Sequence, residues 1–149
     1  MSNKLLFSKK TDPNSKTFPI TPTKANPSDA GYDLYSTDDY KLWAGQTICI
    51  STGIYMAIPE GYYGRIADRS SMAKNNLHIV GGVIDCSYRG EIKVLLHNTE
   101  SLGVREISAG QKFAQIIITK ICELEPAVID FNDLPDSARG EKGFGSSGR

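Results

Sequence analysis

A carboxylate stands at the end of a β-branched stretch in GGVIDCSYRGEIKV, residues 81–94. Asp85 occurs where a strand should bury its side chains, and an ionised group is expensive to desolvate there unless it is paired or has a task. Tyr88 follows three residues later, so its ring could form a floor for a sugar while the carboxylate faces a reacting centre. A carboxylate in reach of a water can act as its general base. Taken alone, an Asp after a strand is usually a turn or cap residue.

A second stretch, GRIADRSSMA at 64–73, combines a cation with two hydroxyls at a predicted helix start. Backbone N–H groups and the helix dipole favour an anion at such a start. Arg69 adds a bidentate charge beside Ser70 and Ser71. The ordinary alternative is that a serine is only an N-cap and Arg69 only a surface charge.

Two further polar residues lie in strand-like segments, Asp33 in AGYDLYS at 30–36 and Gln115 in GQKFAQIII at 110–118. Gln115 interrupts an apolar run, and a buried amide must be hydrogen-bonded. It could link two strands or contact a ligand. Asp33 could be an edge residue or could belong to a site.

The glycine-rich tail contains RGEKGFGSSG at 139–148, which combines Arg139, Phe144, Ser146 and Ser147. Its composition indicates a flexible segment. This mixture of residues could also close over a ligand that carries both an aromatic base and phosphates.

The elements that must position these residues are short apolar runs between glycine-rich turns. Several runs alternate with period two and are rich in Ile, Val and Tyr, which predicts an all-β sandwich or barrel. The best helix candidate is SSMAKN, with Ser70 or Ser71 as N-cap. The runs that predict strands are TICIS, IYMAIP, YYGRIA, EIKVLLHN and KFAQIIITKI.

Length and composition narrow the class of protein. The chain has 149 residues, which favours a single domain over 1–149, with an extended N-terminal segment at 1–29 and a mobile lid at 134–149. Seventeen basic and 17 acidic residues give a formal net charge near zero, which argues against a nucleic-acid or membrane-surface binder. Three widely spaced cysteines favour neither a disulfide framework nor a zinc site. We find no signal peptide or membrane span, so we expect a cytoplasmic or nuclear protein, viral or cellular.

In their order and spacing, the five stretches resemble the five motifs of the trimeric dUTP pyrophosphatases (dUTPases). The resemblance covers essentially everything after residue 29. It implies an all-β, jelly-roll-like β-sandwich with one short helix and a flexible C-terminal arm. It also implies a homotrimer with sites at subunit interfaces, each tail reaching a neighbouring site, and Mg²⁺-dependent hydrolysis of dUTP to dUMP and pyrophosphate.

The resemblance assigns the nucleoside to the third motif. Asp85 would activate the water that attacks the α-phosphorus, and Tyr88 would stack under the deoxyribose and leave no space for a 2′-hydroxyl. Main-chain groups would pair with uracil, and these belong to Gly82, Val83, Ile84 and Lys93.

The other motifs are assigned to the triphosphate and the metal. Arg69, Ser70 and the backbone of Ser71 would bind phosphates, and Gln115 would lie near the α-phosphate. Asp33 would approach Mg²⁺ through a water, because magnesium keeps several waters and is held mainly by substrate phosphates. In the tail, Arg139 would hold the γ-phosphate, Phe144 would stack on uracil, and the phosphates would be reached by Gly145, Ser146 and Ser147.

The chain departs from the usual family pattern in four places, one of which is Lys142 in the tail, where a small residue is usual. Asp68 stands for a usual Pro, Ser71 for a usual Gly, and Gln111-Lys112 for a usual Asp-Arg pair. We expect Asp68 to point away from the polyanion or to weaken its binding, and Lys112 to change surface or subunit pairing more than chemistry. Two rivals follow: a dCTP deaminase of the same fold, and a dUTPase-like binding or regulatory protein that has lost catalysis.

Overall fold

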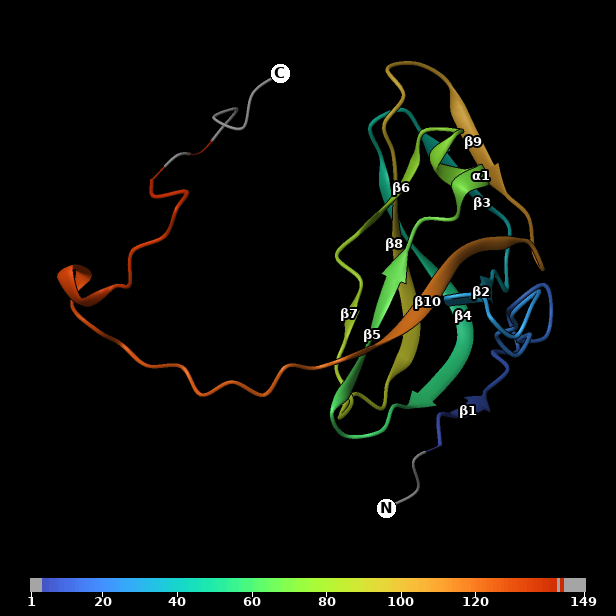
Figure 1. Ribbon diagram of the computed structural model, residues 1–149. Coiled ribbons are helices and arrows are strands. Elements are labelled where there is room, and N and C mark those ends of the chain that lie inside the picture. The colour runs from blue at the N-terminus through green and yellow to red at the C-terminus, as the bar shows by residue number, and fades with distance from the viewer. Residues whose placement is uncertain (1–3, 142, 144–149) are drawn as a thin grey trace.

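The computed structural model describes residues 4–141 and 143, which form ten strands, a one-turn α-helix and a 3-10 turn. Figure 1 shows the strands gathered into one body, with the chain after β10 leaving it. The bounds are β1 Leu6–Lys9, β2 Gly31–Tyr35, β3 Tyr40–Trp43, β4 Thr47–Ala57, β5 Tyr62–Ala67, α1 Ser70–Ala73, β6 Leu77–Val80, β7 Val83–Ile84, β8 Glu91–Asn98, β9 Val104–Ile107, β10 Lys112–Lys120 and η1 Phe131–Asp133.

The strands form two four-stranded antiparallel sheets and one two-stranded ribbon. The sheet orders are β1-β4-β8-β6 and β2-β10-β5-β7, and β3 pairs with β9. The non-consecutive neighbours are typical of a jelly-roll-like fold, and the predicted all-β class is confirmed.

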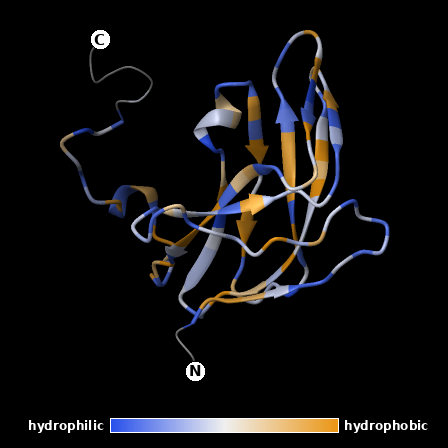
Figure 2. Cartoon of the chain, turned by 90° about the vertical axis from the view of Figure 1, so that its right-hand side faces the viewer, coloured by the Kyte–Doolittle hydropathy of each residue, from blue (hydrophilic) through white to orange (hydrophobic). Residues whose placement is uncertain are grey.

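The core lies between the two sheets and is built by alternation along the strands. In β8, Ile92, Val94 and Leu96 are buried, while Lys93 and Leu95 face outward. Phe113 and Ile116 of β10 join the same apolar cluster from the opposite sheet. Figure 2 shows apolar bands along the strands and hydrophilic connections around them.

The N-terminal segment contains one short strand. We predicted an extended surface segment over 1–29, and the structure places β1 inside it, paired with β4 from Leu6↔Ala57 to Lys9↔Ile54. Phe7 packs on Tyr32 with ring centroids 5.6 Å apart, and this contact adds to the pairing of β1 with β4.

After β10 the chain continues as an exposed arm of residues 121–141 and 143. Several of its large apolar side chains are exposed: Ile121, Leu124, Val128, Ile129, Phe131 and Leu134. Among the described residues, none of the helices has the length and apolar character needed to cross a membrane.

Candidate active site

Three strands carry polar residues to one row of the second sheet. Gln115 of β10 lies opposite Asp33 of β2 on one side and opposite Ala67 of β5 on the other. Asp68 and Arg69 follow Ala67 directly. The strand register therefore brings the stretches that contain Asp33, Arg69 and Gln115 together at this end of the sheet.

Asp33 is the centre of a charged cluster. Its Oδ1 lies 2.9 Å from Arg69 Nε, and its Oδ2 lies 2.9 Å from Lys112 Nζ. The Asp33 side chain is only 15% exposed, so the two cations balance a largely covered carboxylate. The hydrogen bond and charge of Asp33 raise the pKa of Lys112 above its ordinary value. Two cations held by one carboxylate leave a net positive charge that suits a phosphate group.

The short helix α1 begins just after this cluster. Its N-cap is Arg69, with no side-chain capping bond, so the prediction of Ser70 or Ser71 as N-cap was wrong; both serines lie inside the helix and are exposed. Ser71 has an ordinary helical backbone, since Asn76 is the one non-glycine residue with positive φ among those described. A serine at position 71 therefore needs no glycine-like conformation.

Asp68 points away from the cation cluster. Its Oδ1 accepts the Ile79 N–H at 2.6 Å, and its Oδ2 lies 2.8 Å from His78 Nδ1, both on the edge strand β6. Its backbone carbonyl accepts the Gln115 Nε2–H at 2.8 Å. Asp68 therefore fixes the loop before Arg69 and also holds the amide of Gln115.

The Gly81–Gly82 turn brings the third motif against β5. Both glycines have positive φ, +75° and +95°. The Gly82 carbonyl accepts the Ile66 N–H at 2.8 Å, and a Cβ at Gly82 would meet Ile66 O at 2.9 Å. Such a close approach requires glycine at 82.

Asp85 and Tyr88 stand at a cavity of about 210 Å³ beyond this turn. The Tyr88 hydroxyl donates to Glu91 O at 3.0 Å, and the Tyr88 N–H donates to Asp85 O at 3.1 Å, so the turn is closed on itself. Asp85 is exposed, so its carboxylate is not desolvated within one chain. The cavity is lined by Val83, Ile84, Asp85, Tyr88, Glu91 and Lys93.

The two clusters lie apart within one chain. Ile84 pairs with Gly64 of β5, whereas Gln115 pairs with Ala67 at the other end of that strand. Asp85 is therefore roughly 13 Å from the Gln115 row along the strands and two strand spacings, about 10 Å, across them. One phosphorus atom cannot contact both clusters of the same chain.

The tail residues are only partly described. Arg139 lies in the exposed arm, at a turn before Gly140. The predicted ligands Phe144, Gly145, Ser146 and Ser147 lie outside the described residues.

The donor set near Asp33 fits a metal that arrives with its ligand. Within the described part of the chain there is no group of three or more His, Cys, Asp or Glu side chains that could hold an ion. Asp33 is also already engaged by Arg69 and Lys112. A single, partly neutralised carboxylate suits contact through water better than a protein cage.

Sequence reasoning missed two residues. A bulge in β10 between Lys112 and Ala114 sets Lys112 opposite Tyr35 and so brings it to Asp33, a contact that the sequence did not indicate. Glu91 lines the nucleoside-sized cavity. No sequence pattern marks the bulge, whereas an acidic residue opening an apolar strand was a signal for Glu91.

Known proteins are similar to this chain in sequence and in fold. The dUTPase family model matches residues 19–148. A deoxyuridine 5'-triphosphate nucleotidohydrolase of Arabidopsis thaliana is 42% identical over 130 residues, covering 87% of this chain and 76% of the relative. The enzyme of the same name from Yaba monkey tumor virus is 38% identical over 149 residues, covering 99% of each. The solved dUTPase of Staphylococcus bacteriophage 80alpha, with dUPNHPP, has a TM-score of 0.86 and 29% identity, and covers 99% of this chain and 100% of that one.

These matches define a nucleotide hydrolase built on a jelly-roll-like β-sandwich. The chain belongs to the dUTPase family, and the resemblance identified from its five motifs is confirmed.

Proposed function

We propose that this chain hydrolyses dUTP to dUMP and pyrophosphate. The observation that carries the proposal is the cavity bounded by Val83, Ile84, Asp85 and Tyr88, which joins a carboxylate to a nucleoside-sized space. The family relationship and the separate cation cluster around Asp33 support it.

In the nucleoside half of the site, the close-packed turn at Gly82 presents main-chain groups of Val83 and Ile84 to uracil. Tyr88 stacks under the deoxyribose and excludes a 2′-hydroxyl. Asp85 takes a proton from a water as that water attacks the α-phosphorus, and the bond to the bridging oxygen of the β-phosphate breaks. The exposure of Asp85 in one chain leaves room for this water.

In the phosphate half, Arg69 and Lys112 supply positive charge and Gln115 an amide. Ser70 and Ser71 donate from the first turn of α1, where N–H groups lack partners within the helix. Magnesium, carried by the phosphates and approached by Asp33 through water, would neutralise charge on the triphosphate.

We propose a homotrimer in which each site takes Asp85 and Tyr88 from one copy and Arg69 and Gln115 from another. The separation of the two clusters within one chain supports this arrangement. The exposed apolar arm after β10 supports it too, because side chains such as Leu124 and Phe131 need a partner surface. Arg139, which lies on this arm, then reaches the substrate of a neighbouring copy.

The test is pyrophosphate release from dUTP, dTTP, dCTP and UTP with Mg²⁺, for the wild-type chain and for Asp85→Asn. Release from dUTP alone, lost in the variant while dUTP still binds, is the expected result. Ammonia release from dCTP would instead indicate a deaminase. Binding of dUTP without turnover by either protein would indicate a regulatory scaffold.

A further inference from the structure

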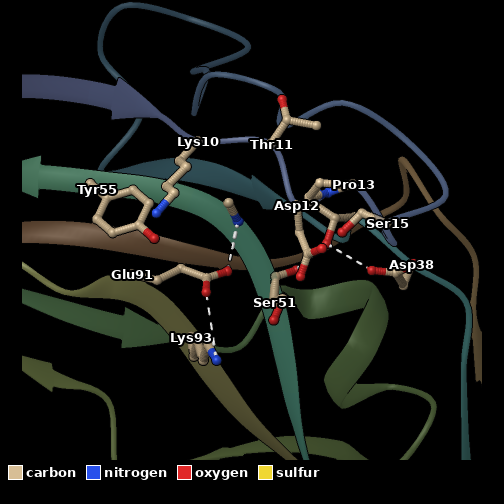
Figure 3. Close-up of a pocket in the computed structure, with 12 residues that line it drawn as sticks. Lys10, Thr11, Asp12, Pro13, Ser15, Asp38, Ser51, Tyr55, Glu91 and Lys93 are labelled. Atoms are coloured by element: carbon tan, nitrogen blue, oxygen red, sulfur yellow. Dashed lines mark hydrogen bonds and ion pairs between the residues drawn. The ribbon is translucent and has the colours of Figure 1, made fainter.

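Glu91 is a largely covered carboxylate for which the proposed reaction has no direct use. It opens β8, where it lies opposite Tyr55, and β4 has an irregularity between Ser51 and Tyr55. Its side chain is only 19% exposed. Figure 3 shows the carboxylate directed between β4 and Lys93.

The Glu91 side chain is anchored in the irregular part of β4. Its Oε1 accepts the Gly53 N–H at 2.9 Å and the Thr52 N–H at 3.2 Å. These two donors are freed from the strand ladder by the irregularity, and a charged acceptor makes the stronger kind of hydrogen bond with them. Gly53 itself is fixed from the other side, since its carbonyl accepts the Lys10 N–H at 3.0 Å.

The remaining groups of Glu91 reach the nucleoside cavity. Its backbone carbonyl accepts the Tyr88 hydroxyl at 3.0 Å, and its Oε2 lies 3.6 Å from Lys93 Nζ. Glu91 and Lys93 line this cavity and also a second one, of about 410 Å³, whose lining residues Figure 3 shows. Glu91 thus connects β4 to Tyr88, whose ring is proposed to stack under the sugar, and to Lys93 of β8, which is proposed to border the base.

We propose that Glu91 is a positioning residue, which holds Tyr88 and the Asp85–Tyr88 turn in register by anchoring the start of β8 to β4. The inference rests on the proposed function of this cavity. Glu91 contacts no reacting atom in it; it acts through the direction of its own carbonyl and through Lys93.

The experiment compares Glu91→Ala and Glu91→Gln with the wild-type chain, using KM and kcat for dUTP and the Kd of dUMP. Glu91→Ala loses the anchor, and misplacement of a binding group by about 1 Å can lower efficiency by up to roughly a hundredfold, so we expect KM and Kd to rise about tenfold or more. Glu91→Gln keeps an Oε1 acceptor and restores most of the affinity. Glu106→Ala, an exposed β9 carboxylate paired with Lys41, is the matched control and leaves both values unchanged.

Tyr88→Phe keeps the ring and removes only the hydroxyl that donates a hydrogen bond to the Glu91 carbonyl. If Glu91 acts through Tyr88, the effects of Glu91→Ala and Tyr88→Phe are not additive in the double variant. If Glu91→Ala does not fold, the other two variants still test the proposal. Positioning is supported if Glu91→Gln binds dUMP almost as tightly as wild type and Tyr88→Phe binds it with a raised Kd.

Wild-type affinity for dUMP in Glu91→Ala would overturn the proposal. So would a Glu91→Gln variant that binds dUMP as weakly as Glu91→Ala, because the charge of Glu91 and not its geometry would then matter. Failure of the wild-type chain to bind dUMP or hydrolyse dUTP is a different result, which would contradict the proposed function itself.

Discussion

Asp68 lies beside the proposed triphosphate site, yet its carboxylate is committed to β6 through Ile79 and His78. Asp68→Ala removes that acceptor and loosens the carbonyl that holds Gln115. We expect the free energy of unfolding to fall by roughly 1 kcal/mol, because two part-buried donors lose their partner. We also expect KM for dUTP to rise. Urea unfolding and steady-state kinetics measure the two effects.

Asp130→Ala, in the exposed arm, is the control for removing one negative charge from the chain. A lower KM in Asp68→Ala would contradict this account, because it would mean that the carboxylate repels the triphosphate more than it orders the loop.

The Lys112–Asp33 ion pair predicts a specific pH dependence of stability. The pKa of Lys112 is raised above 10.5 in the folded chain, chiefly by its hydrogen bond to Asp33. A lysine whose pKa is higher in the folded chain than in the unfolded chain contributes its full stabilisation at pH values below the unfolded-state pKa. This contribution is lost as the pH rises through the folded-state pKa. The difference in unfolding free energy between wild type and Lys112→Met should therefore be constant near neutral pH and shrink above about 10.5. Lys74→Met controls for alkaline effects elsewhere, and a difference that already shrinks near neutral pH would exclude this origin.

At the scale of elements, alternation in the sequence located strands well where they are regular. EIKVLLHN and YYGRIA coincide with β8 and β5. The irregularities were not predictable: TICIS and IYMAIP form one strand, β4, which continues through Gly53, and the bulge in β10 redirects Lys112. Both depend on partners distant in sequence, Glu91 for β4 and β2 for β10. The motifs were accordingly recognisable in the sequence, whereas the contacts that Glu91 makes with β4 and Lys112 with Asp33 were not.

The glycine pair before β7 allows a matched test of how the nucleoside turn is built. Gly81 and Gly82 both have positive φ, so alanine at either position should destabilise the backbone conformation by a similar amount, about 1–2 kcal/mol. A Cβ at Gly81 meets nothing within 4 Å, whereas one at Gly82 meets Ile66 O at 2.9 Å. We expect Gly82→Ala to destabilise the fold more than Gly81→Ala and to weaken dUMP binding. Thermal unfolding and dUMP titration decide this; equal effects of the two variants would mean that contact with β5 is unimportant.

At the scale of the whole molecule, the proposed homotrimer has two half-sites in each active site, so its active unit is larger than one chain. Asp85 and Tyr88 belong to one half-site, and Arg69 to the other, at the far end of β5. Two inactive variants with lesions in different half-sites should therefore complement each other when their copies mix. Two lesions in the same half-site should not, because no site would then receive an intact turn.

Unfolding and refolding Asp85→Asn together with Arg69→Ala should restore roughly a quarter of wild-type activity, because with random mixing one site in four combines an intact turn from one copy with an intact Arg69 from another. Asp85→Asn with Tyr88→Ala, refolded in the same way, should stay inactive. Differently tagged chains that co-purify establish that mixed assemblies have formed in both samples. If mixed assemblies form and neither mixture recovers activity, each site is built from a single chain, and the separation of the clusters must be closed by movement within that chain.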